Sequence, residues 1–219
     1  EQDFSFLKPV KRSTESIESA VSALESDSDK LIHALFWFVK GSHIDETAFE
    51  NLKAGFNVKA VEIWEKVTTN EDQWLHHFTA VNNLSTLKLA MSLQSDNLNQ
   101  EGLAQAINLK LKLIGSSIFP KFVEKTVGTR FDPVADDTMM LFTDNVLNSL
   151  EPHLEQRKVG NLEILAMFAP VTAALKNRVR DRLADKPMQR LNDLLLANKK
   201  KRKADGSQGI KHADYLISK

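Results

Sequence analysis

The chain of 219 residues is 42% hydrophobic and 26% charged, with a formal net charge of zero, which is typical of a globular protein. It contains no cysteine, which excludes disulfides, thiolate nucleophiles and cysteine-based metal sites. No apolar run approaches the ~20 residues that a membrane span needs, and the first residues lack the basic-then-apolar order of a signal peptide. We therefore expect a cytoplasmic protein without a membrane partner.

The first half of the chain predicts a linker followed by a helical region. Residues 1–28 are rich in Ser, Glu and Asp, which favours a linker or a weakly ordered N-terminal segment. The spacing of Ile17, Val21 and Leu24 leaves a short helix as the alternative. Over residues 29–114 apolar residues recur with the helical period. The predicted helices span residues 29–40 (ending at Gly41), 46–54 (capped by Asp45 and ending at Gly55), 58–68 (capped by Asn57, with Val58 on its inner face), 71–93 and 102–114.

The second half predicts further helices and a basic end. Residues 115–133 form a connecting segment around a short helix at about 118–127, and residues 134–198 form a second helical subregion. Its first helix runs to about residue 150 and is interrupted at Pro152. The second runs from 161 to about 184 with a kink or split at Pro170, and the third runs from 187 to about 200. Residues 199–219 form a basic polar tail. Because no segment alternates with a period of two, the class is all-α.

One stretch of the helical region has the spacing of a helical hairpin. Two short amphipathic segments flank a glycine, and small and large apolar residues alternate on their facing sides. Glycine permits the positive φ of a tight turn, alanine allows close helix approach, and a large aromatic fills the groove between the helices. The spacing matches one tetratricopeptide-like (TPR-like) unit, although the next period lacks its glycine and proline. We expect antiparallel hairpins in a TPR-like or irregular helical array, with the first hairpin formed by Ala48, Leu52, Gly55, Ala60, Trp64 and Val67.

A wider stretch, residues 31–91, resembles a known family. The runs that carry the likeness are Ala34–Lys40, Ile44–Ala48, Leu52–Gly55, Lys59–Lys66 and Asn82–Leu87. They are similar to the helical region that follows the J domain in bacterial DnaJ-like proteins. The His-Pro-Asp signature of the J domain itself is absent from this sequence, so the resemblance implies a chaperone-associated binding region and no stimulation of a chaperone ATPase.

The sequence offers no reactive constellation. His76 and His77 are adjacent, so on a helix they point about 100° apart and do not share a metal. The Glu-x-x-His and His-Glu-x-x-His motifs are missing, as are the nucleophile-elbow and phosphate-loop glycine motifs. We expect no catalytic residue, no cofactor and no metal, and therefore no enzyme.

The C-terminal part of the chain is a candidate for anion binding. Residues 1–100 carry a net charge of −6, whereas residues 171–219 carry +8. This asymmetry favours either self-contact or an anionic partner. No aromatic residue is interleaved with the basic ones, so base stacking is unsupported, and a solubilising helix end is the simpler reading. The candidate residues are Arg178, Arg182, Lys199, Lys200, Lys201, Arg202 and Lys203.

Two functions follow, in order of preference. The all-helical pattern, the hairpin and the lack of reactive motifs predict a non-enzymatic scaffold that binds protein partners, in a chaperone system if the resemblance holds. Exposed polar residues over 46–68 and 72–90 would line a groove, with Trp37, Trp64, Trp74 and Phe78 as core or groove residues. The alternative is salt-dependent binding of nucleic acid through residues 176–203.

Overall fold

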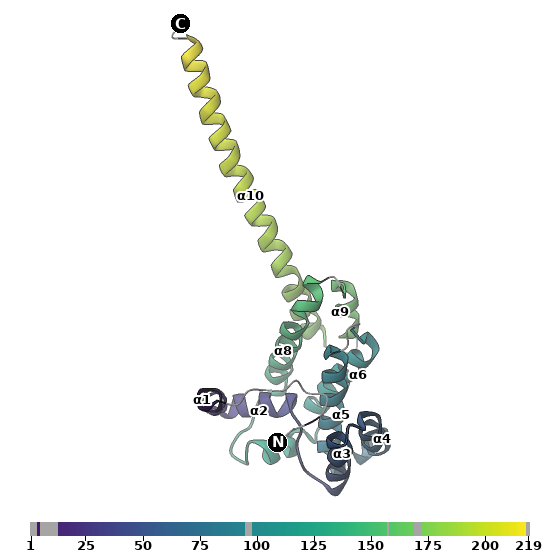
Figure 1. Ribbon diagram of the computed structural model, residues 1–219. Coiled ribbons are helices and arrows are strands. Elements are labelled where there is room, and N and C mark those ends of the chain that lie inside the picture. The colour runs from purple at the N-terminus through teal and green to yellow at the C-terminus, as the bar shows by residue number, and fades with distance from the viewer. Residues whose placement is uncertain (1–3, 5–12, 95–97, 157, 169–171, 218–219) are drawn as a thin grey trace. The chain divides into compact units, whose positions relative to one another are not determined.

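The computed structural model describes residue 4 and residues 13–94, 98–156, 158–168 and 172–217, with the backbone alone at positions 186–187, 190–191 and 201–217. All regular secondary structure in these ranges is helical (Figure 1), which confirms the predicted all-α class. The elements are α1 (Thr14–Ser22), α2 (Asp27–Phe36), α3 (His43–Lys53), α4 (Asn57–Thr68), the 3₁₀ turn η1 (Glu71–Gln73), α5 (Trp74–Gln94), α6 (Gln100–Ile114), α7 (Phe119–Thr126), α8 (Ala135–Glu155), α9 (Asn161–Met167) and α10 (Ala173–Ile217).

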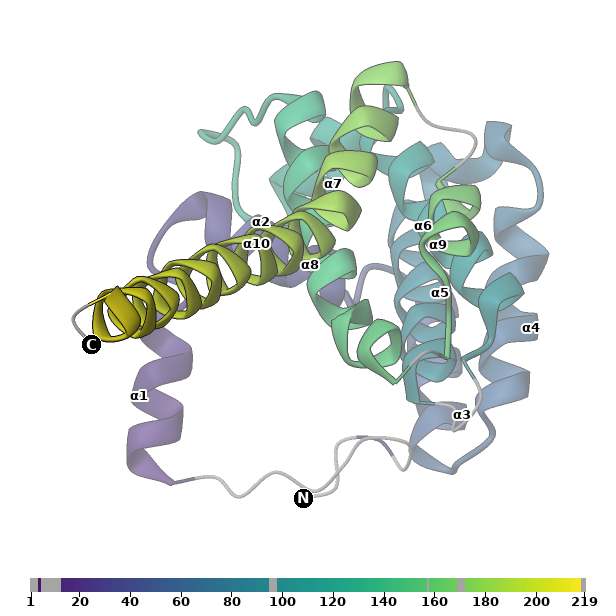
Figure 2. The same ribbon diagram turned by 90° about the horizontal axis from the view of Figure 1, so that it is seen from above.

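The chain divides into two compact units, residues 1–176 and residues 177–219. The first unit holds α1 to α9 and the first turn of α10. The second unit is the remainder of α10, a helix of 45 residues in all that Figure 2 shows as one continuous element. The candidate site described below lies entirely within the first unit.

Helix α5 is the centre of the first unit. Every side chain from Thr79 to Leu87 is buried, so this part of the helix has no solvent-facing side. Helices α3, α4 and α6 pack around it (Figures 1 and 2). A helix that is buried on all sides is normally apolar throughout, yet α5 carries Asn82, Asn83, Ser85 and Thr86 in this stretch. Each of these polar groups therefore needs a hydrogen-bond partner inside the protein.

Helices α3 and α4 form an antiparallel hairpin that packs on α5. Ala48 and Leu52 of α3 and Ala60 and Trp64 of α4 are fully buried and belong to one core cluster with Ala80, Leu84 and Leu87 of α5. The Trp64 ring stacks on Phe38 at 6.0 Å between centroids and meets Phe49 edge-on at 5.7 Å. Aromatic pairs in these arrangements add to the stability gained from burial.

The turn between α3 and α4 depends on a glycine. Gly55 has φ 83°, a conformation in which a Cβ atom is strained. We expect Gly55→Ala to lower the free energy of unfolding by about 1 kcal/mol. Urea unfolding followed by circular dichroism measures this change. Gly55→Asn is the matched control, because Asn tolerates the left-handed region better than Ala does, and a loss equal to that of Gly55→Ala would contradict the conformational explanation.

Helix α2 is shorter than the sequence predicted. It ends at Phe36 instead of continuing to Gly41, and Trp37 is extended, with φ −129° and ψ 170°. Gly41 has a different role from a helix stop: a Cβ atom there would lie 2.5 Å from the Thr79 side chain, so only glycine fits this approach to α5. The cause of the early end is the set of hydrogen bonds described in the next subsection.

The starts of α3 and α4 also differ from the prediction. Ser42, not Asp45, is the N-cap of α3, and Asp45 is the third helical residue, which completes a capping box by accepting from the Ser42 amide. Asn57 is the first residue of α4, whose cap position is Phe56, without a side-chain cap bond. The predicted inner-face residue Val58 is 66% exposed, because the buried face of α4 runs through Ala60, Trp64 and Thr68.

Other helix bounds also differ from the expected ones. Within residues 1–28, α1 is the short helix that the spacing of Ile17, Val21 and Leu24 allows. Helix α8 continues through Pro152 to Glu155, since a proline in the last turn removes only one amide donor. Helix α9 ends at Met167, and Pro170 lies outside the described residues. Helix α10 runs through positions 187 and 199–209 to Ile217, where the sequence predicted a helix start and a polar tail.

Candidate functional site

The residues between α2 and α3 form an extended segment that is bound to α5 by side chains. Asn83 hydrogen-bonds both backbone groups of Val39: its Oδ1 accepts from the Val39 amide at 2.8 Å, and its Nδ2 donates to the Val39 carbonyl at 2.9 Å. Asn82 Nδ2 donates to the carbonyls of Trp37 at 2.9 Å and Ala34 at 3.3 Å. These bonds replace the helical ones, so α2 ends where the side chains of α5 satisfy its backbone.

Asp45 closes the other end of this segment. Its carboxylate is fully buried. Oδ1 accepts from Trp64 Nε1 at 3.0 Å and from Asn83 Nδ2 at 2.9 Å. Oδ2 accepts from Thr79 Oγ1 at 2.7 Å, from the Ser42 amide and hydroxyl at 2.9 and 3.0 Å, and from the Gly41 amide at 3.1 Å. One carboxylate thus joins α3, α4, α5 and the connecting segment, and its charge is stabilised by six hydrogen bonds.

Lys110 of α6 hydrogen-bonds the part of α5 that holds the extended segment. The side chain is fully buried, and its Nζ donates to the Asn82 carbonyl at 3.0 Å, to Asn82 Oδ1 and to Thr86 Oγ1 at 3.1 Å. All three acceptors are neutral, so hydrogen bonds alone offset the loss of hydration. Burial lowers the pKa of Lys110 well below the ordinary value of 10.5. We refer to Asp45, Asn82, Asn83 and Lys110 together as the buried polar network.

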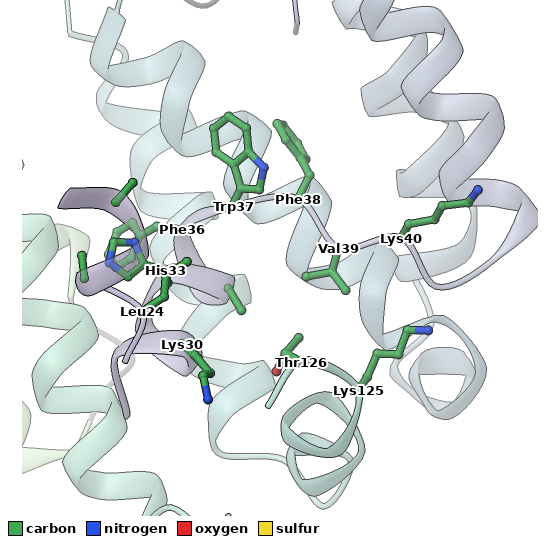
Figure 3. Close-up of a pocket in the computed structure, with 13 residues that line it drawn as sticks. Leu24, Lys30, His33, Phe36, Trp37, Phe38, Val39, Lys40, Lys125 and Thr126 are labelled. Carbon is green, nitrogen blue, oxygen red and sulfur yellow. The ribbon is translucent and has the colours of Figure 1, made fainter. Parts of the chain in front are cut away.

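The extended segment forms one wall of a pocket of about 830 Å³, a volume in the usual range of ligand sites. Helices α1 and α2 and the C-terminal end of α7 supply the other walls. Figure 3 shows Val39 and Thr126 pointing toward each other, while the rings of Trp37 and Phe38 project to the other side of the segment. We call this the basic pocket, lined by Ala20, Ala23, Leu24, Lys30, His33, Ala34, Phe36, Trp37, Phe38, Val39, Lys40, Lys125 and Thr126.

The charges at the basic pocket have one sign. Lys30, Lys40 and Lys125 come from three different elements, and no acidic side chain is among the lining residues. Lys30 pairs with Asp27 at 2.8 Å and Lys40 with Glu46 at 2.8 Å, outside the lining. The hydrogen bond from Lys40, followed by that from His43, lowers the pKa of Glu46. In the described part of the chain Lys125 forms no ion pair or hydrogen bond, so its charge is available to a ligand.

Several lining side chains are open to solvent. Trp37 is 48% exposed and Leu24 is 41% exposed. An isolated exposed apolar residue is ordinary, but apolar side chains gathered in a concave surface with charges around it indicate a binding site. The other two tryptophans, Trp64 and Trp74, are buried, whereas the half-exposed ring of Trp37 lies on the opposite side of the segment from Val39.

The structure brings together some of the predicted site residues. Ala48, Leu52, Ala60 and Trp64 meet in the α3–α4 hairpin, Gly55 forms its turn, and Val67 packs partly buried against the same cluster. Trp74 is in the core, and Phe78 is half-buried. None of the hairpin residues lines the basic pocket, which lies on the other side of the α2–α3 connection.

The predicted anion-binding residues lie on α10. Arg178, Lys199 and Lys200 are exposed, Arg182 is partly exposed, and the side chains at 201–203 are outside the described residues. On a helix, successive residues point about 100° apart, so Lys199 and Lys200 do not share a direction. Binding of nucleic acid through this region stays a prediction.

The basic pocket and the buried polar network were not predicted from the sequence. The pocket combines residues between 20 and 40 with residues 125–126, which are distant in the sequence, so no local motif marks it. The network had one local signal: two adjacent asparagines, Asn82 and Asn83, within a long apolar helix. Asn competes for backbone groups and is unfavourable in a helix interior, so this pair indicated a non-local role.

The described residues form neither a metal site nor a membrane span. Over the ranges with assigned positions, no three His, Asp or Glu side chains are grouped closely enough to hold a metal ion. No helix in the same ranges combines the length and apolarity needed to cross a bilayer. Comparison with models of known families, with curated proteins and with solved structures found no match to the chain.

Proposed function

We propose that this protein is a non-enzymatic helical scaffold that binds protein partners at the basic pocket. The observation that carries the proposal is the pocket itself: a concave, partly exposed surface with apolar walls from α1, α2 and the extended segment, and lysines at its edge. The buried polar network supports it further, because it fixes the wall formed by Trp37 to Lys40. A fixed backbone favours recognition, because binding then costs little conformational entropy.

The chaperone association is the second part of the proposal. It rests on the resemblance of residues 31–91 to the helical region that follows the J domain in DnaJ-like proteins. Trp37, Val39 and Lys40 of the basic pocket fall inside the resembling stretch, whereas Lys125 does not. Partners bound at the pocket would then be chaperones or their clients.

Site-specific photo-crosslinking tests the proposal. A photoreactive amino acid is placed at Leu24 in the pocket and, as the matched control, at Leu162, which is 82% exposed and lies outside the pocket. We expect a distinct set of proteins from the cells of origin to be crosslinked from position 24 and absent from position 162. Identical products from both positions, or none from position 24, would contradict a binding role for the pocket.

A further inference from the structure

We infer that the occupant of the basic pocket is an acidic amphipathic helix of a partner protein, which rests on the proposed function and specifies its ligand. Three features of the first unit support this occupant: the charge of the lining, the openness of the pocket, and the acidic helix α1 at its wall.

The charge of the lining selects an acidic occupant. Lys30, Lys40 and Lys125 line the pocket from α2, the extended segment and α7. With no carboxylate in the lining, a positively charged occupant has no partner there. Opposite charges at an exposed site contribute modestly to affinity, but they steer association and exclude like-charged competitors.

The openness of the pocket selects a chain segment in preference to an enclosed small molecule. Leu24 and His33 are exposed although they line the pocket. A small ligand is usually buried over most of its surface. Walls that are this exposed do not enclose a small ligand to that extent. An amphipathic helix needs burial of one face only and leaves its polar face in solvent.

Helix α1 provides an example of the required chemistry at the pocket wall. It contributes Ala20 to the lining, and the two residues directly after its last turn, Ala23 and Leu24, continue the wall. The helix is acidic, with Glu15 and Glu18 and no basic residue, and none of its side chains is buried. A short acidic helix whose apolar residues are Ile17, Ala20 and Val21 thus already contributes to the pocket wall, and a partner helix of the same character fits against the remaining walls.

Peptide binding to the full chain tests the inference. The probe is a fluorescein-labelled peptide of about 18 residues, or five helical turns, with Leu and Ala along one face and Glu on the other. Matched peptides replace every Glu by Gln or by Lys. Fluorescence anisotropy gives the affinities at low and high salt. We expect the Glu peptide to bind most tightly, the Gln peptide to bind more weakly, and the Lys peptide not to bind, with salt reducing the difference.

Charge reversal in the protein locates the site. Lys125→Glu should weaken binding of the Glu peptide by about fivefold to tenfold, because it replaces an attraction of an exposed charge by a repulsion. Lys121→Glu changes an exposed lysine of the same helix outside the pocket, and we expect it to leave the affinity within about twofold. Both residues are exposed, so circular dichroism melts should remain unchanged for both variants.

The outcomes separate the inference from the proposed function. If the Glu and Gln peptides bind equally, and if Lys125→Glu and Lys121→Glu have the same affinity, the acidic occupant is overturned. The pocket then stays proposed as a protein-binding surface. Preference for the Lys peptide overturns it as well. Binding of none of the peptides overturns the inference, and the proposed function then fails only if crosslinking from position 24 also yields nothing.

Discussion

Replacing Asp45 by alanine should lower the free energy of unfolding by about 4 kcal/mol, because it leaves several buried donors without an acceptor. The Trp64 indole, the Asn83 amide and the Thr79 hydroxyl all lose their acceptor in the core, and the backbone amides of Gly41 and Ser42 lose theirs at the start of α3. Each unsatisfied buried group costs about 1–3 kcal/mol, and partial relaxation of the cavity reduces the sum.

The isosteric replacement Asp45→Asn tests the same hydrogen bonds without creating a cavity. Its amide nitrogen would face donors from either Thr79 or Trp64, so we expect a loss of about 2–3 kcal/mol despite the unchanged volume. Urea unfolding, followed by circular dichroism and by tryptophan fluorescence, measures both variants. Glu46→Gln, at the next residue and partly exposed, is the control and should leave the midpoint near that of the wild type. A small effect of Asp45→Asn would refute the role assigned to the carboxylate.

The stability of the protein should rise with pH in the alkaline range because of Lys110. Its pKa in the folded state is lowered by burial, while the unfolded chain retains a value near 10.5. Between these two values the unfolded state binds one more proton than the folded state, so the free energy of unfolding increases with pH. The slope reaches about 1.4 kcal/mol per pH unit for one proton, and it disappears below the lowered pKa, where both states are protonated.

Comparison of the wild type with Lys110→Met isolates this contribution. The methionine has a similar length and no charge, so the difference in free energy of unfolding between the two proteins should change with pH between the lowered pKa of Lys110 and 10.5. Lys112→Met is the control on the same helix, since Lys112 is exposed and pairs with Glu71 on the surface. Parallel pH profiles for the wild type and Lys110→Met would show that the buried ammonium is not the titrating group.

The parts of the fold that depend on local patterns were predictable from the sequence. The spacing of Ala48, Leu52, Ala60 and Trp64, with a glycine at position 55, specified two facing helices because these residues share one side of each helix at the helical period. The lack of alternating segments likewise specified the all-α class. Burial of one helical face against another requires no knowledge of distant residues.

The candidate site was not predictable because its determinants are distant. The end of α2 is set by Asn82 and Asn83, more than 40 residues further along the chain, and a local reading extends that helix to the next glycine. Asp45 was read as an N-cap because it stands at a helix start, but its buried partners come from α4 and α5. A lysine such as Lys110 is normally on the surface, so its position in the core follows only from the packing of α6 on α5.

The pairing of Asn83 with Val39 has a consequence for the kinetics of recognition. A side-chain amide that bonds both backbone groups of one residue acts as a neighbouring β-strand would, but from inside a helix. Such a wall does not fold upon encounter with a ligand, and the association rate is then limited by diffusion and orientation instead of by a conformational step. Differences in residence time among ligands would reflect the contacts that each ligand makes, since the receptor surface is the same for all of them.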